Sequence, residues 1–226
     1  MLTVIAFIGK ARSGKDTCAR IFKEELNSKG LGYNQGLGLD VEILALADEL
    51  REHMEVLNPI VGELKETGAT FSWNLVIRQF GYEEAKNKFP EMRRIMQTYG
   101  TDIIREKVNQ RYWVDCTIEK ICSMNRDYRD KVVLISDMRF ANEYEAMRSF
   151  FAGKGTGISW FLGIRVTRPE LDDNQSNHQS ENLNWVHGYE CLTITNDGDM
   201  EKLKKTCGQV VGECLEIMNL RSGGNY

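Results

Sequence analysis

One glycine-rich turn near the start of the chain constrains the fold more than any other feature of the sequence. The residues G-K-A-R-S-G-K at positions 9–15 follow Leu2–Ile8, a short run in which Thr3 is the one polar side chain. After the turn, apolar side chains recur at helical spacing, at Cys18, Ile21, Phe22 and Leu26. A buried strand, a tight glycine turn and a helix in this order predict a loop whose backbone N–H groups surround an anion at the helix N-terminus.

The same turn carries side chains suited to the phosphates of a nucleotide. Its G-x4-G-K spacing is that of a P-loop, in which the lysine, here Lys15, reaches the β- and γ-phosphates. A P-loop usually has Ser or Thr after the lysine, but this chain has Asp16, and a hydroxyl follows at Thr17. We therefore expect ATP to be bound by Arg12, Ser13, Gly14, Lys15, Asp16 and Thr17. The alternative is an accidental glycine turn.

Phosphoryl transfer also needs the positive charge of Mg²⁺. Asp16 can order this ion through a water molecule, and Thr17 can serve a phosphate directly. Alternatively, Asp16 is an acidic residue that stabilises the first turn of a helix. The six cysteines include no C-x-x-C pair and the chain has three histidines, so the sequence offers no zinc-like site and predicts reduced cysteines.

Strand and helix patterns alternate along the rest of the chain. Helical periodicity at 91–108 is interrupted at Gly100, while 58–90 is more polar and less periodic, so we expect a substrate-binding insertion there. The fold class predicted is α/β and P-loop NTPase-like, with a parallel sheet flanked by helices in a single domain over 1–226. Strands are expected at 2–8, 41–46, 132–135, 158–166 and 189–195, and helices at 16–29, 47–57, 141–151 and 200–218.

Two further charged groups are candidates for the same site. Asp137 ends an apolar strand, at the edge of the sheet where ligands bind in open α/β folds, and Arg139 can grip a phosphate through two hydrogen bonds. An aspartate here can instead cap the next helix. Arg168 precedes Pro169 and a polar stretch, which predicts a lid over 167–184; an ordinary exposed loop is the alternative.

Composition excludes several classes of protein. Lys and Arg total 29 against 33 for Asp and Glu, and this net charge of −4 argues against a non-specific nucleic-acid binder. No apolar run is long enough to span a membrane. We therefore expect a cytoplasmic protein with no nucleic-acid or membrane partner, and the sequence leaves open whether it forms a homodimer.

With these residues in place, the chain resembles the phage-type deoxynucleoside monophosphate kinases, a branch of the P-loop nucleoside monophosphate kinase fold. The resemblance covers most of the chain in order. At position 51 the family usually has lysine, and Arg51 keeps the charge but changes the donor geometry. The motifs are G-K-A-R-S-G-K-D-T (9–17), L-A-D-E-L-R (46–51), R-R-I-M-Q-T-Y-G-T-D (93–102), Y-W-V (112–114), D-M-R-F-A-N-E (137–143), V-T-R-P (166–169) and T-N-D-G (195–198).

The resemblance implies a role for each matching position. Lys15, Asp137, Arg139 and Arg168 would be catalytic, with Arg168 acting from the lid. Asn196 and Gly198 would lie near the adenine of ATP. The acceptor would be bound by Arg51, Arg93 or Arg94, Gly100, Thr101, Trp113, Asp137, Arg139 and Glu143. Trp113 offers a face on which a base can stack, but it is equally suited to a place in the core.

The implied reaction transfers the γ-phosphoryl group of ATP to a deoxynucleoside monophosphate, giving the diphosphate and ADP for deoxynucleotide synthesis. It would take place in the host cytoplasm if a phage encodes the protein. Two alternatives remain. One is a P-loop kinase for another phosphorylated acceptor, of the dephospho-coenzyme A or phosphomevalonate type. The other is a nucleotide-binding module without catalysis.

Overall fold

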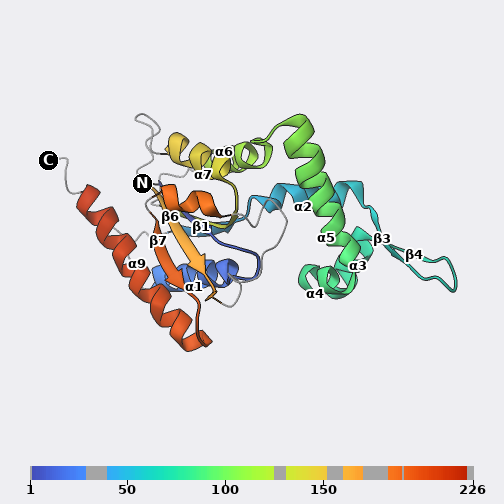
Figure 1. Ribbon diagram of the computed structural model, residues 1–226, viewed down its shortest axis with the longest axis horizontal. Helices are drawn as coiled ribbons and strands as arrows, with labels where there is room; N and C mark the ends of the chain where they lie inside the picture. The colour runs from blue at the N-terminus through green and yellow to red at the C-terminus, as the bar shows by residue number, and fades with distance from the viewer. Residues whose placement is uncertain are drawn as a thin grey trace. The chain divides into compact units, whose positions relative to one another are not determined.

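The computed structural model describes residues 2–28, 40–124, 131–151, 160–169, 183–189 and 191–222 (Figure 1). The chain divides into two compact units. Unit 1 comprises residues 1–46 and 117–226, and unit 2 comprises residues 47–116. The predicted insertion at 58–90 thus falls within a longer compact unit. The extension has a physical reason, because apolar side chains of the flanking helices share one buried cluster with that segment.

Unit 1 is built on a five-stranded parallel sheet with the strand order β2-β5-β1-β6-β7. All seven residues of the central strand β1 are buried, as an unbroken apolar run predicts. The first four expected strands lie within three residues of their predicted bounds, and β5 continues through Asp137 to Met138. The strands are β1 (Leu2–Ile8), β2 (Asp40–Leu44), β5 (Lys131–Met138), β6 (Trp160–Thr167) and β7 (Leu192–Thr195).

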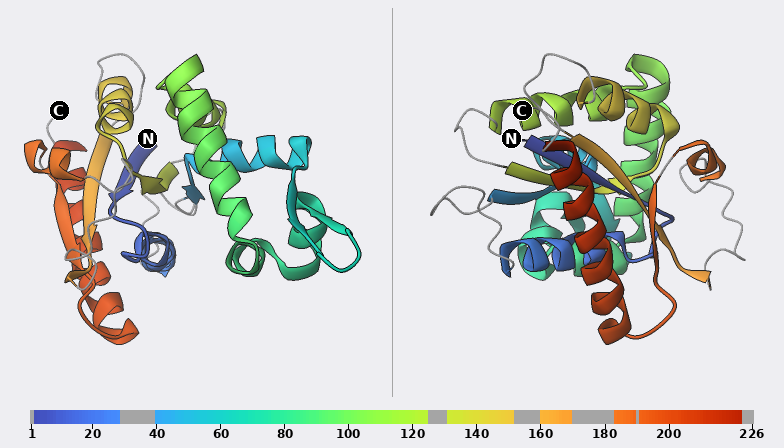
Figure 2. Two further views of the ribbon diagram at one scale, coloured as in Figure 1. Left: turned by 45° about the vertical axis from the view of Figure 1, so that its right-hand side comes forward. Right: turned by 90° about the vertical axis from the view of Figure 1, so that its left-hand side faces the viewer.

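Helices cover both faces of this sheet (Figure 2). Ile164 and Val166 of β6 belong to a core shared with α1 (Lys15–Ser28) and α9 (Met200–Ser222). The intervening residues of a strand face the other way. Accordingly, a Cβ atom on Gly163 would lie 2.8 Å from Tyr144 of α7 (Ala141–Phe151). The predicted α/β class, a parallel sheet flanked by helices, is confirmed. Unit 1 also contains the 3-10 helix η4 (Asn184–Gly188) and most of α6 (Tyr112–Met124).

Unit 2 is a helical body with one short antiparallel hairpin. Its core is centred on Trp73, Met54 and Met92, which are almost completely buried. The low periodicity of 58–90 reflects four short elements in place of one long one. In order, the unit contains α2 (Ala47–Leu57), β3 (Ile60–Glu63), β4 (Thr70–Ser72), α3 (Trp73–Phe80), α4 (Tyr82–Lys88), α5 (Pro90–Gln97) and the π-helix η1 (Thr98–Val108).

The predicted interruption at Gly100 is a change of helix type. After α5 the chain continues as the wider π-helix, which ends with the Asn109 N–H donating to the Ile104 carbonyl at 2.9 Å. A Cβ atom on Gly100 would lie 2.9 Å from Cδ2 of Leu50. Glycine at this position therefore lets η1 pack closely against the Leu50 side chain of α2. Such π-helical segments are rare and often occur at functional sites.

Two predictions from composition can be compared with the structure. All six cysteines lie in described segments, and each is a free thiol. Among the described residues, no helix combines the length and the apolar character that crossing a membrane requires.

Candidate functional site

The glycine-rich turn forms a compact loop between β1 and α1. Gly14 has a φ of 101°, which favours glycine, and a Cβ atom on Gly9 would lie 2.5 Å from the Val166 carbonyl oxygen of β6. Helix α1 begins directly after the loop, with the Cys18 N–H donating to the Gly14 carbonyl at 2.8 Å. The loop therefore leads into a helix N-terminus, which attracts anions.

Lys15 lies across this loop with a 5% exposed side chain. Its Nζ donates to the Lys10 carbonyl at 2.7 Å. This hydrogen bond places the ammonium group beside the loop. A P-loop lysine contacts bound phosphates from this position.

Asn196, at the end of β7, fixes the other side of the loop. Its Nδ2 donates to the Ser13 carbonyl at 2.9 Å, and its backbone N–H donates to the Thr167 carbonyl at 2.8 Å. A Cβ atom on Gly14 would lie 2.6 Å from the same Nδ2. Asn196 thus joins the phosphate-binding loop to the ends of β6 and β7, which is a contact that the sequence does not predict.

A pocket of about 370 Å³ opens beside this loop in unit 1. It brings together most of the residues predicted to bind ATP, and it includes Arg168. Ser13 is the exception, because it is 1% exposed and does not line the pocket. Its hydroxyl has no hydrogen-bond partner among the described residues. The lining residues are Arg12, Gly14, Lys15, Asp16, Thr17, Arg168, Asn196, Gly198, Asp199, Met200 and Leu203.

Three of these lining residues are not predicted by the sequence. Asp199, Met200 and Leu203 lie at the start of α9. The apolar spacing predicts that Met200 and Leu203 lie on the buried face of this helix. Leu203 is buried, but Met200 is 52% exposed. An exposed methionine at the edge of a polar pocket offers a base an apolar contact.

The donors at the start of α1 fit the predicted magnesium ion. Asp16 and Thr17 line the pocket, and Mg²⁺ in phosphate sites usually takes one or two protein oxygens together with water and phosphate oxygens. In the part of the chain that the structure describes, no group of three or more His, Cys, Asp or Glu residues is placed to hold a metal by itself. These residues therefore fit an ion that is shared with phosphates.

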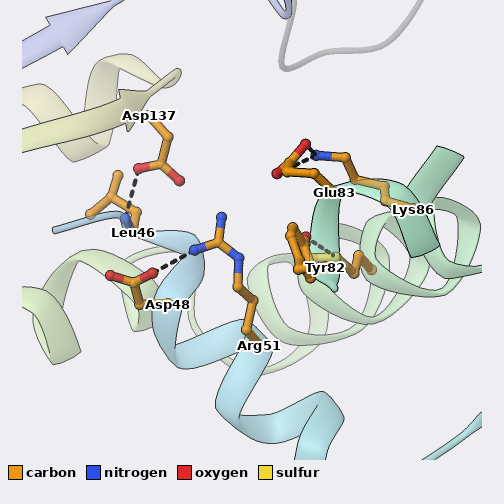
Figure 3. Close-up of polar contacts among 8 residues, drawn as sticks. Leu46, Asp48, Arg51, Tyr82, Glu83, Lys86 and Asp137 are labelled. Atoms are coloured by element: carbon orange, nitrogen blue, oxygen red, sulfur yellow. Dashed lines mark hydrogen bonds and ion pairs between the residues drawn. The ribbon is translucent and has the colours of Figure 1, made fainter. Parts of the chain in front are cut away.

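Asp137 lies on β5 and Glu143 in the first turn of α7, and their carboxylates accept hydrogen bonds from different backbone N–H groups. Asp137 Oδ1 accepts a hydrogen bond from the Leu46 N–H at 2.7 Å, which links the ends of β5 and β2 (Figure 3). Glu143 is 4% exposed, and its Oε2 accepts from the N–H groups of Arg139 and Phe140, each at 3.1 Å. Glu143 thus accepts backbone N–H groups at the start of α7, as a capping carboxylate does. The predicted contact of Glu143 with substrate remains a prediction.

Trp185 is a neighbour of Arg139 that the sequence does not single out. Its indole Nε1 donates to the Arg139 carbonyl at 3.3 Å. Trp185 lies in η4, just beyond the lid predicted at 167–184. Residues 170–182 of that lid lie outside the described residues, so the lid stays a prediction.

In unit 2, Arg51 and Lys86 lie beside the same aromatic ring (Figure 3). The Arg51 guanidinium is 5.0 Å and the Lys86 ammonium 5.1 Å from the centroid of Tyr82. Arg51 forms an ion pair with Asp48, and Lys86 forms one with Glu83 at 2.8 Å. Lys86, in the poorly periodic segment, is a second cation that sequence reasoning missed.

Arg93 and Arg94 of α5 differ in their surroundings. Arg94 is exposed and donates to both carboxylate oxygens of Glu91, and this pairing raises the pKa of Arg94 and lowers that of Glu91. Arg93 is also exposed. Arg94 is thus paired with a carboxylate, as Arg51 is with Asp48, and an exposed pair of this kind contributes little, so Arg93 and Arg94 both stay candidates for a phosphate.

Trp113 and Gly100, both expected at the acceptor, contact each other. Trp113 is 5% exposed and its Nε1 donates to the Gly100 carbonyl at 3.0 Å. The rings of His53 and Tyr112 pack edge-on against it, with centroids 5.4 and 4.9 Å away. This geometry favours the core alternative over base stacking. Thr101, next to Gly100, is half-buried on η1.

A family model described as deoxynucleotide monophosphate kinase matches residues 28–207. The chain belongs to this family. It is a kinase, an ATP-dependent phosphotransferase, as the sequence motifs predict. The matched region begins after the P-loop, so the loop geometry and the family match are independent observations. No curated protein matches the sequence significantly.

Solved structures similar to this kinase include two other kinases. One is the APS kinase CysC of Mycobacterium tuberculosis in complex with AMPPNP and APS, with a TM-score of 0.43 and 16% identity over 95% of this chain and 97% of that one. The other is dephospho-CoA kinase from Campylobacter jejuni, with a TM-score of 0.41 and 12% identity over 96% of this chain and 98% of that one.

Proposed function

We propose that this kinase transfers the γ-phosphoryl group of ATP to a 2′-deoxynucleoside 5′-monophosphate, giving the diphosphate and ADP. The family match over residues 28–207 carries the proposal. Further support comes from the pocket beside the P-loop, which lies entirely in unit 1 and has Lys15 and Arg168 in its wall.

In the ATP pocket, the residues of unit 1 bind and neutralise phosphates. The backbone N–H groups of the loop and the Lys15 ammonium hold the phosphate oxygens, and Arg168 contributes a second positive charge. Asp16 and Thr17 would hold Mg²⁺ beside the phosphates. When bound, this ion supplies positive charge that stabilises the transferring group.

The acceptor is bound by its phosphate. Arg51 and Arg93 or Arg94 provide the cations in unit 2, and Arg139 acts on the reacting group from the end of β5. An acceptor phosphate oxygen already carries negative charge, so little base catalysis is needed, and the protein contributes alignment and charge neutralisation. Asp137 fits a positioning role, because its carboxylate already accepts the Leu46 N–H.

A panel of acceptors tests this proposal. ADP release from Mg-ATP is measured with each deoxynucleoside monophosphate, with each ribonucleoside monophosphate, and with dephospho-coenzyme A and phosphomevalonate. We expect the highest kcat/KM with one or more deoxynucleoside monophosphates. A higher kcat/KM with the coenzyme or mevalonate compound contradicts the assigned acceptor, and ADP release with none of them contradicts the assigned catalysis.

A further inference from the structure

The peptide group between Arg139 and Phe140 is held from both sides. Its carbonyl accepts a hydrogen bond from the indole of Trp185 at 3.3 Å, and its N–H donates to Glu143 Oε2 at 3.1 Å. The same carboxylate oxygen accepts the N–H of Arg139 at 3.1 Å. Three hydrogen bonds from two side chains therefore fix the backbone on both sides of the Arg139 Cα atom.

Each of the two side chains is itself held in place. Glu143 is 4% exposed in the first turn of α7, so its carboxylate has little freedom to leave these N–H groups. The Trp185 ring packs against Tyr144 of α7 and against Tyr189, with both centroids 5.7 Å away. The Tyr189 hydroxyl in turn donates to Glu145 of α7. The frame around Arg139 is thus built from α7 and η4 together.

We propose that Trp185 and Glu143 are positioning residues that orient the Arg139 side chain for phosphoryl transfer, a role that rests on the proposed function of Arg139. Fixing the peptide group after Arg139 and the N–H before it fixes φ and ψ of this residue, and so the direction of its Cα–Cβ bond. A guanidinium acts at the end of a long side chain, where a small rotation of that bond becomes a large displacement. Misplacement of about 1 Å in an active site can reduce the rate by up to about 10²-fold.

Steady-state kinetics of Trp185→Phe tests the positioning role, because phenylalanine keeps a ring in the aromatic cluster and removes the indole N–H. We expect kcat to fall about tenfold, with the KM for ATP unchanged. Trp160→Phe is the matched control, since it makes the same exchange on β6 of unit 1, outside the aromatic cluster beside Arg139, and it should keep the wild-type kcat. Equal kcat values for Trp185→Phe and the wild type overturn the proposal.

A double-mutant cycle separates positioning from a general structural effect. If Trp185 acts through Arg139, Trp185→Phe causes no further loss of kcat in an Arg139→Ala protein. Additive losses overturn the proposal. Full activity of Arg139→Ala alone contradicts the role of Arg139 in the proposed function, which is a separate outcome.

Hydrogen exchange provides a readout that does not depend on turnover. The Phe140 amide should be protected in the wild type, and it should exchange at least about fivefold faster in Trp185→Phe, because one of the bonds that hold its peptide group is lost. Trp160→Phe should leave this rate unchanged. Unchanged exchange in Trp185→Phe overturns the proposal even if the enzyme proves inactive with every acceptor tested.

Discussion

At the scale of single residues, Lys15 is the side chain on which catalysis should depend most. Its ammonium donates to the Lys10 carbonyl and lines the pocket where the phosphates of ATP are expected. We expect Lys15→Ala to reduce kcat by about 10²–10³, the range found for other preorganised electrostatic groups. Lys23→Ala, further along α1, is the control and should have wild-type kcat. Near-wild-type turnover of a folded Lys15→Ala protein contradicts the P-loop assignment.

Trp113 should matter for stability and not for the choice of base. Trp113→Phe leaves the buried Gly100 carbonyl without its indole partner, a loss that costs about 1–3 kcal/mol of unfolding free energy. Denaturant unfolding measures this cost, and the ratios of kcat/KM among the deoxynucleotides should stay as in the wild type. Altered ratios in a protein of undiminished stability would favour the stacking alternative.

The residues predicted from the sequence and those missed differ in one physical respect. Lys15, Asp16 and Thr17 belong to a local pattern whose chemistry depends on neighbours in the chain. Trp185 and Lys86 acquire their positions through contacts with Arg139 and Tyr82, which no local spacing encodes. Trp113 is an intermediate case, because an apolar flank suits a core and a base pocket equally well.

At the scale of elements, α4 contains a matched pair of lysines. Lys86 and Lys88 each form an ion pair with a glutamate on the same helix, but Lys86 shares the Tyr82 ring with Arg51, whereas Lys88 lies over Phe80. We expect Lys86→Gln to raise the KM for the deoxynucleoside monophosphate about threefold to tenfold, the effect of one weakened charged hydrogen bond. Lys88→Gln should leave this KM unchanged, and equal effects of both variants contradict a local role for Lys86.

The stability of the protein should depend on Gly100 of the π-helix η1. Gly100→Ala places a methyl group 2.9 Å from Leu50, and overpacking of this kind costs about 1–3 kcal/mol. Thermal unfolding should report the loss, and the affinity for ATP should not change because the ATP pocket lies in unit 1. A Gly100→Ala protein as stable as the wild type means that Leu50 can move away without cost.

Elements with a complete apolar pattern are the ones that the sequence predicts well. Leu2–Ile8, Ala47–Leu57 and Ala141–Phe151 have the predicted bounds, the strand because of its nearly continuous apolar run and the two helices because of their apolar spacing. The elements between Ile60 and Lys88 are each eight residues or shorter, so none contains enough turns or alternations to give a clear period. The change from α-helix to π-helix at Thr98 depends on packing between elements. The glycine at position 100 indicates only that the helical pattern is interrupted.

At the scale of the whole molecule, the two units should contribute to the two substrates separately. The ATP pocket is built from unit 1, and Arg51 belongs to unit 2. Arg51→Ala should therefore raise the KM for the deoxynucleoside monophosphate about 10- to 100-fold, as expected for one or two charged hydrogen bonds. Calorimetry should show an unchanged Kd for ATP. A comparable loss of ATP affinity contradicts this division of roles.

Transfer of labelled phosphate tests the central claim most directly. The enzyme is incubated with Mg²⁺, ATP labelled in its γ-phosphate and each deoxynucleoside monophosphate, and the products are separated. A deoxynucleotide monophosphate kinase with an intact P-loop site places the label on a deoxynucleoside diphosphate, in an amount equal to the ADP formed, and Lys15→Ala slows the transfer by about 10²–10³. Label that appears only as inorganic phosphate, or remains in ATP with every deoxynucleotide, contradicts the account.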